Sequence, residues 1–229
     1  FAGAVAKQAL AQYGIIVGSH ILQINDIKEE RFNPMGVSDA ELAELHTKKF
    51  AVMDDAVGEK MQERILQAKS ELNSVGGVIE AIALHLPAGI GAPYFDSVES
   101  MLSHALFSVP AVKGVEFGDG FGFARLTGAE ANDALHYVDG KVKALTNHNG
   151  GVTGGITNGM PFVVRVAIKP TPSIAREQQT VSLKEQADTT LAIFGRHDPC
   201  IVQRAVPVIE AVVAWTLWDL LLEAKKWEK

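Results

Sequence analysis

The most apolar part of the sequence is its C-terminal stretch, VIEAVVAWTLWDLLLEA, at residues 208–224. Its apolar residues cover most of the circumference of a helix, so the helix must be buried by other layers of structure. The stretch is shorter than a membrane span and is interrupted by Glu210 and Asp219. We therefore predict a core helix that begins near Pro207, because proline is favourable at the first position of a helix.

The overall charge and the single cysteine limit what the protein does. Its 229 residues carry a formal net charge of −6, so we expect no bulk attraction to nucleic acid or to an anionic membrane. The lone cysteine, Cys200, cannot form an internal disulfide and fits a reducing cytoplasm. No low-complexity linker divides the chain, so we predict one domain over residues 1–229. The opening FAGAVAKQALAQYG is a helical pattern without a cap, and we expect the chain to be the truncated back part of a longer one.

Apolar runs typical of strands alternate with amphipathic stretches typical of long helices. Strands are predicted at 14–26, 78–87, 111–118, 161–173 and 189–195. Helices are predicted at 1–13, 37–50, 54–72, 95–110 and 207–224. Ser38 and Glu41 have the spacing of a capping box, and Gly76-Gly77 would end the third helix. The glycine-rich stretch 130–160 is predicted to be a loop with a short hairpin at Asp139-Gly140.

Charged residues gather just before the apolar helix, in GRHDPCIVQRAVP at 195–207. Burying charges is costly unless they are paired or meet a ligand, so this stretch is either a structural ion-pair cluster or one wall of an anion site. Arg196 could hold a phosphate or carboxylate through two parallel hydrogen bonds. Asp198 could relay a proton or orient its neighbours, and His197 is better explained as a packed or hydrogen-bonded neighbour than as a catalyst.

Two further segments could bind an anion, although each also has an ordinary structural explanation. The loop NHNGGVTGGITNGM at 147–160 has the flexible backbone and free N–H groups that anion-binding loops use, but it matches no nucleotide-binding fingerprint. KPTPS at 169–173 offers one cation and two hydroxyls directly after a strand. No metal site is predicted, because His197 and Cys200 are too few to form one. The other histidines lack ligand spacing and are taken as structural or solvent-facing: His20, His46, His85, His104, His136 and His148.

These segments, in this order, resemble the chorismate synthase family. The resemblance extends through GGVIEAIALHLPAGIGAPYFDSVESMLSHALFSVPAVKGVEFGDGF, KPTPS, GRHDPC and RAVP, and covers at least residues 75–222. The opening FAGAVAKQALAQYGI is similar to the family segment that follows its SARET signature. The resemblance implies an α+β fold in which a helix layer, including 54–72 and 207–224, is sandwiched between antiparallel sheets. It also implies a homotetramer.

The resemblance further implies an activity and a set of site residues. The family converts 5-enolpyruvylshikimate 3-phosphate to chorismate and phosphate, a step toward the aromatic amino acids, and it needs reduced FMN although the reaction changes no oxidation state. Asp198 would lie near the central-ring nitrogen of the flavin, and Arg196 would contact both the flavin and the substrate. The cofactor-binding residues implied are Pro110, Ala111, Gly154, Lys169, Pro170, Thr171, Pro172, Ser173 and Arg196.

The chain departs from the family pattern in ways that bear on activity. Asn73 stands where the family usually has an aspartate. The family's two functional histidines, several substrate-binding arginines and the SARET segment have no counterpart in residues 1–229. We therefore expect this chain alone to be inactive. The alternative is a non-catalytic fragment or assembly protein that keeps the fold and a flavin- or phosphate-binding surface.

Overall fold

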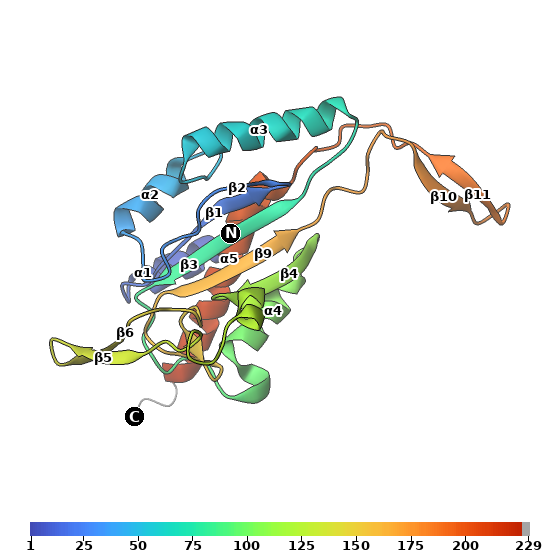
Figure 1. The fold of residues 1–229 in the computed structure, drawn as a ribbon. Coiled ribbons are helices and arrows are strands. Elements are labelled where there is room, and N and C mark those ends of the chain that lie inside the picture. Colours follow the sequence, from blue (N-terminus) through green and yellow to red (C-terminus); the bar gives the residue numbers. More distant parts are fainter. Residues whose placement is uncertain (226–229) are drawn as a thin grey trace.

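A five-stranded antiparallel sheet organises the computed structural model, which describes residues 1–225 (Figure 1). The strand order is β2-β1-β3-β9-β4, so strands from both halves of the chain lie side by side. The strands are β1 (Ile16–Ile24), β2 (Ile27–Lys28), β3 (Gly77–Leu84), β4 (Val112–Phe117) and β9 (Phe162–Ile168). The predicted strands at 14–26, 78–87, 111–118 and 161–173 are confirmed, with shorter bounds.

Three helices cover one face of this sheet: α1 (Ala2–Ala11), α4 (Val98–Phe107) and α5 (Val202–Lys225). The helix α5 packs against β1 and β3 and against both other helices, so it is the core helix that its apolar sequence predicts. Gly3 lets α1 approach α5 closely, since a side chain there would collide with Ala211. Ser97 caps α4 by accepting a hydrogen bond from the Ser100 N–H.

Two predictions about α5 were wrong. The helix begins at Val202, and Pro207 lies inside it instead of at its first position. The extra first turn buries Val202 and Val206, and the burial of two apolar side chains outweighs one lost backbone hydrogen bond. The stretch is also not too short for a span: within residues 1–225, α5 is the one helix whose length and composition would allow it to cross a membrane. Half of the most apolar part of α5 is buried inside the protein, as in the core helix of a soluble domain.

The helices α2 (Asp39–Thr47) and α3 (Asp55–Ser70) lie outside the α1–α4–α5 layer (Figure 1). Leu42 of α2 packs against Gly18, on the face of β1 that points away from α5. The predicted capping box of Ser38 and Glu41 is confirmed. The helix α3 follows the sheet edge beside β1 and β2, and it ends before Leu72, which adopts a left-handed φ of 57°. Gly76-Gly77 therefore do not end this helix but lead into β3.

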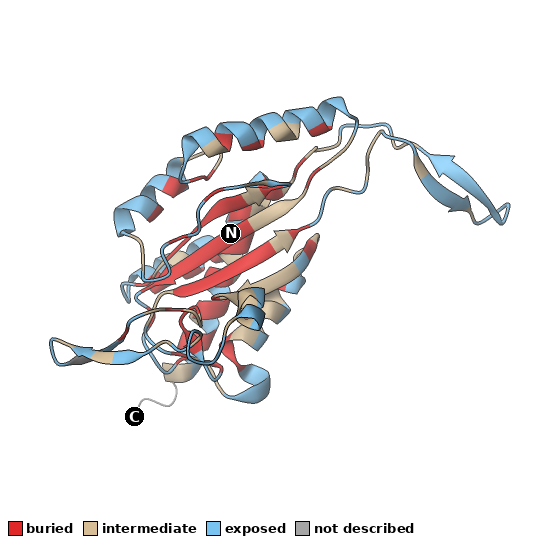
Figure 2. Ribbon diagram, in the orientation of Figure 1, coloured by how far each residue is buried: buried red, intermediate tan, exposed pale blue. Residues whose placement is uncertain are grey.

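The remaining strands form three two-stranded hairpins: β5 (Leu135–Val138) with β6 (Lys141–Ala144), β7 (Val152–Thr153) with β8 (Ile156–Thr157), and β10 (Gln178–Ser182) with β11 (Ala187–Leu191). The predicted hairpin at Asp139-Gly140 is the first of these. The strand predicted at 189–195 is displaced, since β11 ends at Leu191 and belongs to an exposed arm that projects from the body (Figures 1 and 2).

The α+β class is confirmed. The part of the chain that the structure describes contains one large sheet and its helix layer, whereas its other sheets are two-stranded. Two short 3-10 helices, η1 (Tyr94–Asp96) and η2 (Gly120–Arg125), complete the elements. The outer surface of the helix layer exposes Trp215 and Phe107, as expected of a face that another layer could cover.

Candidate functional site

Three of the predicted cofactor segments meet beyond the C-terminal end of β9. The Ala111 carbonyl accepts a hydrogen bond of 2.9 Å from the Lys169 N–H, which joins the start of β4 to the exit of β9. Ser74 and Val75 connect the 169–173 segment to the 196–199 segment. The Ser74 hydroxyl donates to the Thr171 carbonyl at 2.6 Å. The Val75 N–H donates to the Pro199 carbonyl at 2.8 Å, so the 169–173 and 196–199 segments are held by one short connection.

The backbone of this region is tightly constrained. Ala111 has a φ of 75°, a left-handed conformation that costs a residue with a side chain on the order of 1 kcal/mol and that clusters at functional sites. Gly76 lies against Ile168 and Pro170 so closely that no side chain would fit there. Asn73 accepts a hydrogen bond of 2.9 Å from the Ser74 N–H. Asn73 therefore belongs to the connection that holds the site together.

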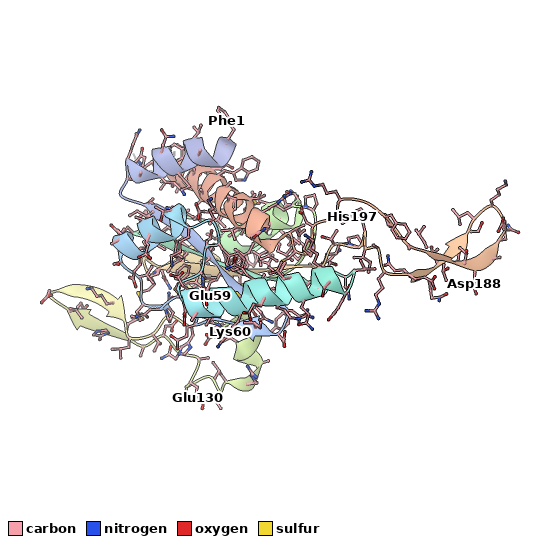
Figure 3. The ribbon with its side chains drawn as sticks, turned by 90° about the horizontal axis from the view of Figure 1, so that it is seen from above. Phe1, Glu59, Lys60, Glu130, Asp188 and His197 are labelled. Atoms are coloured by element: carbon pink, nitrogen blue, oxygen red, sulfur yellow. The ribbon has the colours of Figure 1, made fainter. Side chains whose placement is uncertain are left out.

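Two buried polar atoms in this region lack partners. Within the described residues, Thr171 Oγ1 and His197 Nε2 are buried and make no hydrogen bond. Leaving such atoms unpaired costs about 1–3 kcal/mol each, so folded proteins usually satisfy them with a ligand, an ion or water. Thr171 is one of the cofactor residues that the family resemblance implies, and His197 lies between Arg196 and Asp198, which the resemblance also places at the flavin. Figure 3 shows His197 at the base of the projecting arm that carries Asp188.

The charged residues of 195–207 do not form a buried ion-pair cluster. Asp198 pairs with Arg204 at 2.8 Å, and the two side chains are 40% and 71% exposed. Arg196 is exposed, and no ion pair is found for it within residues 1–225. Cys200 is buried beside them, and this burial raises the pKa of its thiol. Of the two sequence-based explanations, an open wall that can meet an anion fits this arrangement better.

One predicted cofactor residue lies elsewhere. Gly154 is exposed in the turn between β7 and β8, and its neighbour Gly155 packs against Ser97 at the start of α4. The 169–173 segment follows the opposite end of β9, and a seven-residue strand is roughly 20 Å long. The remaining residues, Pro110, Ala111, Lys169, Pro170, Thr171, Pro172, Ser173, Arg196 and Asp198, lie in the segments beyond that end.

A second group of charged residues, which the sequence did not predict, crosses the face of the sheet that points away from α5. His20, Glu80, Arg165 and Glu116 come one from each of four adjacent strands and occupy paired register positions. We call these four residues the charged row. His20 Nε2 lies 3.1 Å from Glu80, and Arg165 donates to Glu80 at 3.1 Å and to Glu116 at 2.6 Å. The signal in the sequence is a single ionisable residue inside each of three apolar strands, β1, β3 and β9, whereas β4 carries Lys113 as well as Glu116.

Three residues of the charged row are buried, Glu116 is partly exposed, and all four are paired within the protein. His20, Glu80 and Arg165 are at most 3% exposed, and His20 also contacts the buried Glu29. Burial alone would lower the pKa of His20, but its hydrogen bonds to Glu29 and Glu80 raise the pKa above the usual value. Burial alone would raise the pKa of Glu80, and its bonds to His20, Phe32 and Arg165 lower it. The row therefore has partners for its charges without a ligand.

The fold and these contacts define a class before any family comparison: an α+β protein with a candidate polar site built from loops at one end of an antiparallel sheet. A sequence model of the chorismate synthase family matches residues 1–222, and the chain belongs to that family.

Individual relatives agree with this assignment. The chain is 45% identical over 227 residues to a chorismate synthase of Thermococcus gammatolerans, with 99% of this chain and 62% of the relative covered. It is 43% identical over 225 residues to one of Korarchaeum cryptofilum, with 98% and 61% covered. A solved chorismate synthase structure matches with a TM-score of 0.78 and 30% identity, over 97% of this chain and 61% of the other. The chain thus spans about three fifths of the length of these relatives.

Proposed function

We propose that the protein to which this chain belongs is a lyase that converts 5-enolpyruvylshikimate 3-phosphate to chorismate and phosphate with reduced FMN. The observation that carries this proposal is the match of the chorismate synthase family model to residues 1–222. Two unpartnered buried atoms in the convergent cofactor segments, Thr171 Oγ1 and His197 Nε2, support a ligand there. They fit a polar cofactor, because each could exchange a hydrogen bond with it. When bound, reduced FMN supplies electron density to the reacting substrate and a ring nitrogen that can take up a proton.

The residues of this chain would bind and orient the two ligands. The segment 169–173 and the 110–111 turn would hold the flavin, with Lys169 and Arg196 opposing its phosphate charge. Arg196 would also face the substrate phosphate, whose departure develops negative charge that a fixed guanidinium stabilises. Asp198, held by Arg204 at 2.8 Å, would orient the groups around the flavin nitrogen. No hydrolytic nucleophile is needed, because the phosphate leaves without attack by water.

The position of Gly154 supports self-association, and the family resemblance implies that the assembly is a homotetramer. If Gly154 and the 169–173 segment both contact flavin, the separation across β9 means that a single copy cannot bring them to the same ring. A neighbouring copy would then supply one of the two. The exposed Trp215 on the outer helix face also offers apolar surface for a partner or for another layer of the same protein. We expect a cytoplasmic enzyme that acts on a small-molecule substrate. Residues 1–229 would form one domain, although residues 226–229 lie outside the described residues.

Flavin binding tests this proposal. Purified protein is titrated anaerobically with reduced FMN, and the change in flavin absorbance gives the dissociation constant. Thr171→Val removes the unpartnered hydroxyl but keeps the shape of the side chain, and we expect about tenfold weaker binding. Ser182→Ala on the exposed arm removes a hydroxyl elsewhere and should leave binding unchanged. Equal affinities for all three proteins would overturn the flavin site.

Turnover is tested separately, by the release of phosphate from the substrate under the same anaerobic conditions. We expect no measurable release from residues 1–229 alone, since residues that act as a unit in catalysis fail together. The resemblance assigns the catalytic histidines and further arginines to a segment outside these residues. Turnover near that of a complete enzyme would show that this segment is dispensable and that the roles assigned above are wrong.

A further inference from the structure

A second charged hollow, of about 570 Å³, opens beside β4 and η2. Two arginines, Arg31 and Arg125, and two acids, Glu116 and Asp119, line it. The hollow lies apart from the candidate flavin site. The N–H of Gly118, which stands between the lining residues Glu116 and Asp119, donates to the Val163 carbonyl near the start of β9, whereas the flavin segments follow the end of that strand. Figure 3 likewise shows Glu130, shortly after η2, far from His197.

The two acids of the hollow are already committed to partners in the protein. Glu116 accepts a hydrogen bond of 2.6 Å from Arg165 and one of 3.2 Å from the Phe121 N–H. Asp119 lies 2.6 Å from His148 Nδ1. Each of these carboxylates therefore already has a cationic or N–H partner within the protein.

The two arginines, in contrast, have donors to spare. Arg31 forms an ion pair with Asp119 at 3.9 Å, but this separation is too long for a hydrogen bond, so the N–H donors of Arg31 are not used by it. For Arg125, no ion pair is found among residues 1–225, and its side chain is exposed. Each guanidinium carries five N–H donors in a planar fork that matches the oxygens of a phosphate or carboxylate. The hydrogen-bonding groups of the hollow that have no partner are thus mainly the N–H donors of its two arginines.

The hollow is built on a rigid base. Arg165 also donates to the Gly118 carbonyl, and Gly118 and Gly120 both adopt a φ of 53°, which favours glycine. A side chain at Gly120 would collide with Glu116. On the other side, the N–H of Phe32, next to Arg31, donates to the buried Glu80 at 2.6 Å. The charged row therefore fixes both the η2 turn and the backbone that carries Arg31.

We propose that this hollow is a second anion-binding site, in which Arg31 and Arg125 together bind the oxyanion of a small phosphorylated or carboxylated molecule. The paired acids shape the site and limit it to small anions, since a larger polyanion would meet the charge of Asp119 at its edge. This site is independent of the proposed flavin site, because it shares no residue with it.

The test is a titration of isotope-labelled protein followed by the backbone amide signals of residues 116–126. Inorganic phosphate and succinate are the two probes, and sodium chloride at matched ionic strength is the control. We expect saturable shifts with at least one probe, and about tenfold weaker binding in Arg31→Gln and in Arg125→Gln. Arg176→Gln removes the same charge beyond the other end of β9 and should bind like the unaltered protein.

The two probes separate the sources of the anion. Shifts with phosphate alone assign the site to phosphate esters, and shifts with succinate alone assign it to carboxylates. Shifts confined to residues 169–173 and 196–198 would overturn the second site while leaving the flavin site intact. Equal shifts with chloride, or equal affinities in all the arginine variants, would also overturn it. Both substituted arginines are on the surface, so the variants are expected to fold, which the unchanged amide signals of the β-sheet would verify.

Discussion

On one face of the sheet, His20, Glu80 and Arg165 are buried and bonded to one another, whereas beyond the end of β9, Arg196 and Arg204 are exposed to solvent. Both regions are built from cations and carboxylates. In the charged row nearly every hydrogen-bonding group has a partner in the protein, but in the 196–204 region the only ion pair is exposed and the buried His197 Nε2 has no partner.

This difference separates two uses of charge. Charges that are buried and mutually paired hold strands together, and removing one member leaves the others stranded in a medium of low dielectric. Charges that are exposed and incompletely paired contribute little to the stability of the fold. Their unused hydrogen-bonding groups can therefore bind a ligand. Substitutions in the first region should therefore unfold the protein, and substitutions in the second should impair binding.

The largest effect is expected for Arg165→Met, which removes the cation bonded to Glu116 and leaves Glu80 with His20 as its one remaining charged partner. We expect a loss of about 3–5 kcal/mol in the free energy of unfolding, because one charge of a buried pair becomes uncompensated. Urea denaturation followed by circular dichroism measures it. If this variant does not fold, Arg165→Lys provides the comparison, since it keeps the charge and loses the planar fork. Two variants as stable as the unaltered protein would show that the row is not a structural element.

A smaller change in free energy, confined to binding, is expected for Arg196→Gln. The affinity for reduced FMN should fall about ten- to a hundredfold, because a charge-assisted hydrogen bond to phosphate is lost. The free energy of unfolding should change by no more than about 0.5 kcal/mol, as for other exposed positions. Anaerobic flavin titration and urea denaturation on the same preparation measure the two quantities. A large loss of stability with intact flavin affinity would reverse the proposed roles of the two regions.

The charged row should contribute to the pH dependence of stability, and we expect a smaller effect than from either substitution. The pKa of His20 is raised, so its contribution is complete below 6.5 and is lost as the pH rises through the folded value. The pKa of Glu80 is lowered, so its contribution is present above 4.5 and is lost as the pH falls through the folded value.

Urea midpoints measured from acid to alkaline pH test this dependence. His20→Gln should remove the decline on the alkaline side, whereas Arg196→Gln should keep the profile of the unaltered protein. The same alkaline decline in His20→Gln would assign it to another group.

The smallest effect is expected for Arg204→Gln, which breaks the pair with Asp198. Exposed ion pairs contribute about 0.2–1 kcal/mol, and both of these side chains are largely in solvent. We expect a loss of stability within that range, which salt should mask. Surface charges are screened at an ionic strength of about 1 M. A loss of several kcal/mol in the free energy of unfolding that persists at this salt concentration would show that the region is structural.

The sequence predicts most of the large elements because their local patterns agree with their burial. The strands at Ile16–Ile24 and Phe162–Ile168 are apolar runs, and the helix at Asp39–Thr47 has a capping box that fixes its start. The β10–β11 arm escapes because its strands are polar and exposed, so no core pattern marks them. The start of α5 escapes because the preference for proline at a first position is weaker than the burial of Val202 and Val206.

The site is only partly predictable for a different reason. The resemblance identifies the segments at 110–111, 169–173 and 196–198 as cofactor-binding, and that assignment stays a prediction. Residue spacing could not show that Ser74 and Val75 tie two of these segments together, since the partners are about a hundred residues apart or more. The charged row is hidden in the same way, because its pairing depends on the alignment of strands 60 and 85 residues apart.

That alignment gives the charged row a role during folding. A sheet of apolar strands can shift by two residues and still bury the same face, so apolar alternation alone leaves several pairings close in energy. In the native pairing Arg165 lies opposite Glu80. A two-residue slip would set it opposite Val78 or Ile82 and strand both charges among apolar side chains. The same would happen between β1 and β3, where His20 meets Glu80. The charged row thus favours one register for the three strands β1, β3 and β9 over the registers that are shifted by two residues.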